Sequence, residues 1–130
     1  MVFFSTRKRS GGTNVIINDG EIKMRMLMYV VIYVTAKDLA EGQKIAHSLV
    51  EQKLVACVNI VKDVQSVFSW EGKIDSSSEV LLVMKSRKAL MPRIIRAVKM
   101  IHSYQLPEII ALPIVGGSRE YLNWITRSTK

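Results

Sequence analysis

The stretch "YVVIYVTAKDLAEGQKIAHSLVEQK", residues 29–53, changes its hydrophobic period part-way along and so points to the fold class. Residues 29–35 are almost continuously apolar and mostly β-branched or aromatic, which predicts a β-strand covered on both faces. From residue 36 to residue 53 apolar side chains recur at intervals of three and four, which predicts one amphipathic helix with Gly42 close to the sheet. The stripe that this helix is expected to bury holds Leu39, Ile45, Ala46, Leu49 and Val50.

The segment that follows predicts a long β-hairpin. Residues 54–70 are expected to form one strand, interrupted by a bulge near Lys62 and Asp63, and residues 74–86 its partner. The tripeptide Glu-Gly-Lys at 71–73 supplies the turn between them. The apolar run at 80–84 predicts that the second strand lies in the middle of a sheet.

The last third of the chain predicts helix, strand, helix. Residues 87–102 are expected to form a helix capped by Ser86, with Pro92 in its first turn because a proline deeper inside would break a backbone hydrogen bond. Residues 108–115 predict a final strand, and residues 118–128 a short helix capped by Ser118. The second helix is expected to bury Leu90, Ile94, Ile95, Val98 and Ile101.

The resulting order, β-α-β-β-α-β-α, is the split-βαβ plan: an α+β domain whose antiparallel sheet carries both helices on one face. The two inner strands are nevertheless apolar on both faces. Burying one apolar side chain contributes about 1.5–3 kcal/mol, so an uncovered strand face would be costly. We therefore expect another copy of the chain to cover it in a symmetric oligomer, with the long hairpin reaching into a neighbour.

Residues 1–28 are expected to be a flexible extension, and residues 29–130 the folded domain. The segment "RKRSGGT", residues 7–13, has few apolar side chains with which to pack. Asn18-Asp19-Gly20 suits the turn of a small hairpin. The whole chain has a formal net charge of +8, which is compatible with anionic partners but equally with plain solubility.

Composition excludes several classes of protein. Hydrophobic residues make up 48% of the chain and charged residues 23%, as in soluble globular proteins, and no run approaches the roughly 18 apolar residues of a membrane-spanning helix. The single cysteine, Cys57, excludes an intrachain disulfide and favours a reducing compartment, so we expect a cytoplasmic protein.

Catalytic and nucleic-acid motifs are missing from the sequence. It contains no serine nucleophile elbow, Walker loop or dinucleotide-binding glycine pattern, so we do not expect an enzyme. The inner strands also lack the aromatic and basic signature of an RNA-recognition domain, so no nucleic-acid partner is expected.

Metal binding is the better candidate among site chemistries. Cys57 and His102 offer ligand atoms that borderline and soft ions prefer, and Glu108 adds a carboxylate. Their spacing is not diagnostic of any metal. Burial of Cys57 as a small apolar side chain is a more common explanation for its place in "VACVNIV" than ligation.

Five segments in order resemble the CutA family, the divalent-cation tolerance proteins. They are "LVEQKLVACVNIV" (49–61), "VFSWEGKI" (67–74), "SSEVLLVMKS" (77–86), "IHSYQLPEIIALPIVGG" (101–117) and "YLNWI" (121–125). This resemblance implies a stable homotrimer of ferredoxin-like βαββαβ subunits with an extra C-terminal helix, and a connection to copper and other divalent metal ions. It also implies a cleft between subunits, to which it assigns Cys57, Trp70, Lys73, His102, Tyr104 and Glu108.

Two positions depart from the family pattern. Ser103 stands where most members have a proline, and Val34 where some have a cysteine proposed as a copper ligand. The metal-binding interpretation therefore depends on His102 and Glu108, with Cys57 as the third ligand. The alternative is a trimeric signalling or interaction protein, similar to PII proteins, whose cleft holds a small anion or a partner segment. Lys73 and the arginines of the second helix would favour the anion.

Overall fold

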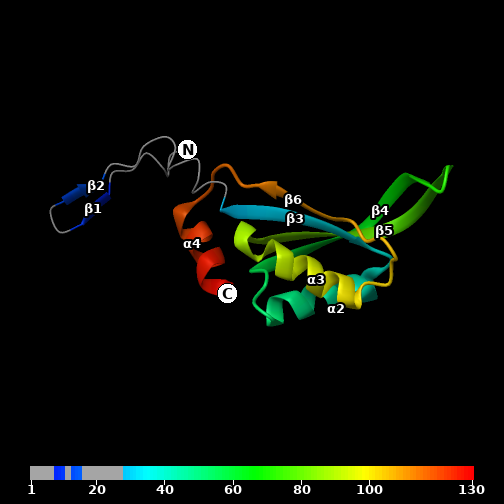
Figure 1. Ribbon diagram of the computed structural model, residues 1–130, viewed down its shortest axis with the longest axis horizontal. Helices are drawn as coiled ribbons and strands as arrows, with labels where there is room; N and C mark the ends of the chain where they lie inside the picture. Colours follow the sequence, from blue (N-terminus) through cyan, green and yellow to red (C-terminus); the bar gives the residue numbers. More distant parts are fainter. Residues whose placement is uncertain (1–7, 11–12, 16–27) are drawn as a thin grey trace.

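The computed structural model describes residues 8–10, 13–15 and 28–130 (Figure 1). From Tyr29 onward its elements follow the predicted order of strands and helices, with one additional 3₁₀ turn, η1. They are β3 (Tyr29–Ala36), α2 (Leu39–Glu51), β4 (Cys57–Trp70), β5 (Lys73–Arg87), η1 (Lys88–Leu90), α3 (Met91–Ile101), β6 (Ile109–Pro113) and α4 (Arg119–Ser128). The predicted α+β class, βαββαβ with an extra C-terminal helix, is confirmed.

The four strands β3 to β6 form one antiparallel sheet in the order β4-β5-β3-β6, and α2 and α3 lie together on one of its faces (Figure 1). In the centre of the sheet Ile32 lies opposite Met84 on one side and Ala111 on the other. Ile32 and Met84 point toward the helices and are fully buried. The rest of the core comes from the same face of the sheet and from α2 and α3, as expected for a two-layer domain.

The other face of the sheet is only partly covered within one chain. Along β3, buried side chains alternate with the half-buried Val31 and Tyr33. On the edge strand β6, their partners Leu112 and Ile110 are 47% and 52% exposed. Both long helices pack on the same side of the sheet, as expected (Figure 1), and the predicted cover of the second face by another copy of the chain stays a prediction.

Helix α2 approaches the sheet as closely as its sequence predicted. A Cβ atom on Gly42 would lie 2.8 Å from Cγ2 of Val80, closer than real Cβ contacts, so only glycine fits without a shift. Ile45, Ala46 and Leu49 are buried as expected. Leu39 and Val50, predicted for the same stripe, are exposed because they lie at the two ends of the helix, beyond the arc that touches the sheet.

Helix α3 begins later than the sequence predicted. Ser86 is still part of β5, fully buried, and its hydroxyl donates to the carbonyl of Leu54 at 2.5 Å, so the prediction that it caps the helix is wrong. The chain passes through η1 before α3 starts at Met91, and Leu90 at the cap position makes no side-chain hydrogen bond. Pro92 lies in the first turn, as predicted.

The β4–β5 hairpin extends well beyond the rest of the sheet, and its far part bends away from the helices (Figure 1). The predicted bulge is confirmed by a shift in pairing between Val61 and Val64, where Asp63 has a φ of 60°. The predicted turn is confirmed as well, with Glu71 and Gly72 both in the left-handed region.

Helix α4 closes the end of the sheet where β3 begins (Figure 1). Leu122 and Ile125 are buried in a small second core with Ala56. Ser118 accepts a hydrogen bond from the backbone N–H of Tyr121 at 3.4 Å, which confirms the predicted cap.

Two short segments of the predicted extension pair with each other, β1 (Lys8–Ser10) antiparallel to β2 (Thr13–Val15). The turn predicted at Asn18-Asp19-Gly20 lies outside the described residues. The division into an extension up to residue 28 and a domain from residue 29 stays a prediction. In the described part of the chain, no helix is both long and apolar enough to cross a membrane.

Candidate functional site

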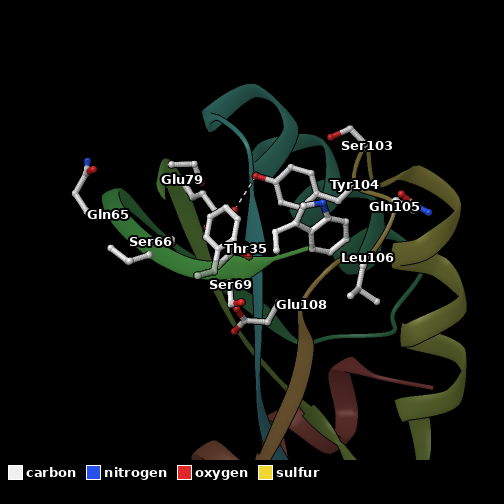
Figure 2. Close-up of a pocket in the computed structure, with 14 residues that line it drawn as sticks. Thr35, Gln65, Ser66, Ser69, Glu79, Ser103, Tyr104, Gln105, Leu106 and Glu108 are labelled. Carbon is white, nitrogen blue, oxygen red and sulfur yellow. Dashed lines mark hydrogen bonds between the residues drawn. The ribbon is translucent and has the colours of Figure 1, made fainter. Parts of the chain in front are cut away.

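A cavity of about 910 Å³ lies between the bent part of the hairpin and the loop that joins α3 to β6 (Figure 2). The hairpin contributes the consecutive residues 65–70 of β4 together with Ser77 and Glu79 of β5. The other wall comes from Thr35, at the end of β3, and from the loop residues Ser103, Tyr104, Gln105, Leu106 and Glu108. The bulge at Asp63 shapes this cavity, because a bulge bends the strand that carries it.

Tyr104 and Glu79 join the two walls. The Tyr104 hydroxyl donates to Oε2 of Glu79 at 2.7 Å (Figure 2). Glu79 is 8% exposed, so its carboxylate is largely shielded from solvent. Burial and the hydrogen bond to a carboxylate both raise the pKa of Tyr104 well above its ordinary value, so the phenol is neutral at physiological pH.

Both ring nitrogens of His102 are engaged in hydrogen bonds. Nε2 lies 2.8 Å from the carbonyl oxygen of Thr35, and since a carbonyl only accepts, Nε2 carries the proton. Nδ1 in turn accepts from the backbone N–H of Tyr104 at 3.0 Å. The imidazole thus holds the start of the loop against the end of β3, and a metal ion would have to displace one of these two bonds.

Glu41, at the start of α2, fixes the same loop from the helix side. Its carboxylate accepts from the backbone N–H of Ser103 at 2.8 Å and from that of Lys37 at 3.1 Å. Burial alone would raise the pKa of Glu41. These hydrogen bonds and the nearby His102 outweigh burial and hold this pKa below its ordinary value. A proline at position 103, the usual family residue, would have no N–H for this contact.

The predicted site residues are divided among three places. Trp70, Tyr104 and Glu108 line the cavity, and His102 adjoins it through its bonds to Thr35 and Tyr104. Lys73 pairs with Trp70 at the end of the hairpin but does not line the cavity.

Cys57 lies at the opposite end of the sheet. It pairs with Lys85, whose Nζ is 3.7 Å from the cysteine Sγ, and the Tyr121 hydroxyl is 3.9 Å from the same sulfur. Lys85 is four residues along β5 from Leu81, the partner of Thr35, a distance of about 13 Å at the usual rise per residue. Cys57 and His102 therefore do not meet within one chain, and the described residues contain no group of three or more metal-ligating side chains.

Sequence reasoning did not select Glu79 or Phe68, although both line the cavity. The signal for Glu79 was present: a single carboxylate directly before the apolar run at 80–84, in a strand otherwise buried at that point. Phe68 gave no comparable signal, because its place depends on how far the hairpin bends.

Comparison with known proteins decides the family. A family model described as CutA1 divalent ion tolerance protein matches residues 30–128. The chain belongs to the CutA family. The resemblance carried by the five segments is thereby confirmed.

Curated CutA relatives differ in length from this chain. A chloroplastic CutA protein from Arabidopsis thaliana is 48% identical over 101 residues, which cover 78% of this chain and 56% of that protein. The divalent-cation tolerance protein CutA of Thermus thermophilus is 40% identical over 102 residues, 78% of this chain and 99% of the relative. The chain thus spans a little over half the length of the plant relative and nearly all of the bacterial one.

Solved CutA structures share the fold. The Thermus thermophilus protein superposes with a TM-score of 0.78 at 40% identity, covering 79% of this chain and all of that one. CutA1 from Oryza sativa gives a TM-score of 0.78 at 43% identity, covering 81% and 96% of the two chains.

Proposed function

We propose that this protein acts in divalent-cation tolerance as a homotrimer that binds metal ions such as copper, and that it is not an enzyme. The observation that carries the proposal is the family match over residues 30–128. Relatives from Thermus thermophilus and Archaeoglobus fulgidus are named divalent-cation tolerance proteins. Imidazole and carboxylate groups, which suit copper, lie at the cavity in His102 and Glu108.

The partly open face of the sheet supports the trimer. Val31 and Tyr33 are half-buried there, and Ile110 and Leu112 beside them are exposed. A contiguous apolar surface of this kind is typical of an interface. A neighbouring copy would also be needed to complete the set of metal ligands, since Cys57 can join His102 only across a subunit boundary.

The metal proposal is tested by calorimetric titration of copper into chelator-stripped protein. We expect saturable binding at a simple ratio per chain, lost in His102→Ala. The matched control is His47→Ala, because His47 is exposed on α2 and does not line the cavity. Weak binding without a simple ratio, or equal binding by the two variants, would contradict the proposal.

A second function, a PII-like signalling or interaction trimer, is favoured by the cavity itself. Its volume of about 910 Å³ is in the range of small-molecule sites, and far larger than one metal ion needs. Native mass spectrometry of the purified protein tests this function independently of copper. We expect a small ligand to be retained by the wild type and lost when Trp70 in the lining is replaced by alanine.

The cytoplasmic location remains part of the proposal. It rests on the single cysteine, whereas the Arabidopsis relative is called chloroplastic and the solved Archaeoglobus fulgidus protein is called periplasmic. Fractionation of the source cells, followed by immunodetection of the chain, would separate these three compartments.

A further inference from the structure

The charge of the cavity differs from that of the molecule. Of the fourteen described residues that line it, two are carboxylic acids, Glu79 and Glu108, and none is Lys, Arg or His. The chain as a whole has a net charge of +8. Two carboxylates gathered in one hollow of a basic protein attract a cation locally and repel an anion.

The basic residues from which the sequence predicted an anion lie elsewhere. Lys73 is outside the lining, at the end of the hairpin. Arg93 and Arg96 of α3 border a separate hollow of about 330 Å³, which includes Met100 and none of the residues of the larger cavity. Within one chain, none of the basic residues that favoured an anion lines this cavity.

Aromatic side chains accompany the two carboxylates. Phe68 and Trp70 from β4 and Tyr104 from the loop all line the cavity, and the first two are more than a third exposed. The face of an aromatic ring attracts cations, most strongly in tryptophan. Tyr104 stays neutral beside Glu79 and so keeps its ring available without adding a charge.

The remaining walls are suited to a ligand with an apolar body. Leu106, from the loop, lines the same cavity and is 71% exposed. A bare metal ion would gain nothing from this apolar side chain. An organic cation would use the carboxylates for its charge and the rings and aliphatic groups for the rest of its surface.

We propose that this cavity binds an organic ammonium ion: a positively charged nitrogen held between the carboxylates and the aromatic rings, with an apolar body against Leu106. The proposal rests on the second function above, a small ligand in the cleft. The proposed ligand is a cation, whereas the basic residues of the sequence favoured an anion.

The test compares three probes on the metal-free full-length chain: choline, its neutral isostere 3,3-dimethylbutan-1-ol, and inorganic phosphate. Choline and the alcohol have nearly the same shape and differ in charge. By calorimetry, or by chemical-shift changes in NMR spectra, we expect choline to bind about threefold or more tightly than the alcohol and phosphate not to bind. Added salt should weaken choline binding.

Two variants locate the binding. Glu108→Gln and Trp70→Leu should each weaken choline about threefold, because each removes one partner of the cation while leaving the buried core intact. The controls are Glu120→Gln and Trp124→Leu, since both residues belong to α4 and neither lines the cavity. They should bind choline as the wild type does.

Each other outcome overturns the proposal in a distinct way. Equal affinity for choline and the alcohol would mean that the site recognises apolar shape and not positive charge. Phosphate binding that is lost in the lining variants would mean that the cavity binds an anion. Choline binding unchanged by Glu108→Gln and Trp70→Leu would place it outside the cavity. If none of the probes binds and native mass spectrometry finds no retained ligand, the cleft function fails as well, whereas the copper titration is unaffected.

Discussion

Gly42 shows at the level of one residue how closely α2 packs on the sheet. A methyl group there would meet Cγ2 of Val80 at 2.8 Å and Cδ2 of Leu82 at 3.3 Å. Both neighbours are buried, so neither can move aside freely. Glycine at this position thus has a packing role that outweighs its poor helix propensity.

We expect Gly42→Ala to lower the free energy of unfolding by about 1–2 kcal/mol, because the overpacking exceeds the gain in helix propensity. Chemical denaturation measures this change. The matched control is Gly116→Ala, where an added Cβ meets nothing within 4 Å. If Gly42→Ala proved as stable as the control, the helix would have to lie farther from the sheet than described.

Glu41 makes the stability of the loop depend on pH. The pKa of Glu41 is below the ordinary value of 4.5 in the folded chain. Its ionised carboxylate therefore contributes fully to the free energy of unfolding above pH 4.5, and this contribution is lost as the pH falls through the folded pKa. Glu41→Gln should therefore unfold at a lower denaturant concentration than the wild type at pH 7. The difference in unfolding midpoint between the two proteins should become smaller below about pH 4.5, as the wild-type carboxylate becomes protonated.

Denaturant titrations at several pH values between 3 and 7 test this prediction. Glu51→Gln is the control, since Glu51 is exposed on the same helix. If the difference in unfolding midpoint between the wild type and Glu41→Gln stayed constant with pH, the charge of the carboxylate would not be what holds Ser103 and Lys37.

Sequence reasoning at this scale succeeded where a residue has one dominant constraint. The ring of Pro92 restricts it to a first turn, and Gly42 signals a close approach. It failed for Ser86 because serine serves equally well as a cap and as a buried donor, and only the position of the Leu54 carbonyl decides between them. The two hydrogen bonds of the His102 ring could not be predicted either, because one partner, Thr35, is 67 residues away in the sequence.

At the scale of elements, α2 ends in a hydrogen-bonded motif with an unusual residue. The N–H of Leu54 bonds the carbonyl of Leu49, and the N–H of Lys53 bonds that of Val50, the pair of contacts that defines a Schellman motif. Lys53 occupies the left-handed position, with a φ of 61°, where glycine is usual.

Replacing Lys53 by glycine should raise the free energy of unfolding by roughly 0.5–1 kcal/mol, because it removes the steric cost of a side chain at positive φ. Lys53 is exposed, so little packing is lost. Thermal or chemical unfolding of Lys53→Gly, Lys53→Asn and Lys53→Ala should rank them in that order of stability. A glycine variant no more stable than the alanine variant would argue against this account.

Elements with a clear period were predicted closely, whereas their ends were not. The hairpin, its bulge near Asp63 and its turn at Gly72 came directly from the residue pattern. The start of α3 was misplaced because residues 87–90 continue a helical pattern, yet Arg87 remains paired with Tyr29 in the sheet. Tertiary pairing overrode a local preference there.

For the whole molecule, the far part of the hairpin bears on assembly. Val67 and Ile74, on opposite strands of it, are 73% and 83% exposed within one chain. Large apolar side chains on an extended arm are typical of a segment that packs on another subunit. The proposed trimer would give each arm a surface to contact.

We expect the wild type to have three times the 14.7 kDa mass of one chain in analytical ultracentrifugation, and Ile74→Glu to shift this mass toward that of the monomer. Lys88→Glu, a change of an exposed residue in η1 just beyond the other end of β5, should leave the trimer intact. A monomeric wild type, or an Ile74→Glu protein that remains fully trimeric, would contradict the role assigned to the arm.

The candidate site was predictable only in part. The loop that holds His102, Tyr104 and Glu108 stood out as a dense group of polar residues, and Trp70 followed from the family resemblance. The separation of Cys57 from His102 could not be read from the sequence, because it depends on which strand ends lie together. The acidic lining of the cavity could not be read from the sequence either, because it depends on which residues of the hairpin and the loop come together.

The closed hydrogen bonding of the His102 imidazole has a consequence for the speed of metal capture. A copper ion that collides with the folded chain finds neither ring nitrogen with an available lone pair until the ring has released Thr35 or Tyr104. Capture through this histidine would then wait for the ring to turn, and its observed rate would level off as the copper concentration rises instead of increasing in proportion.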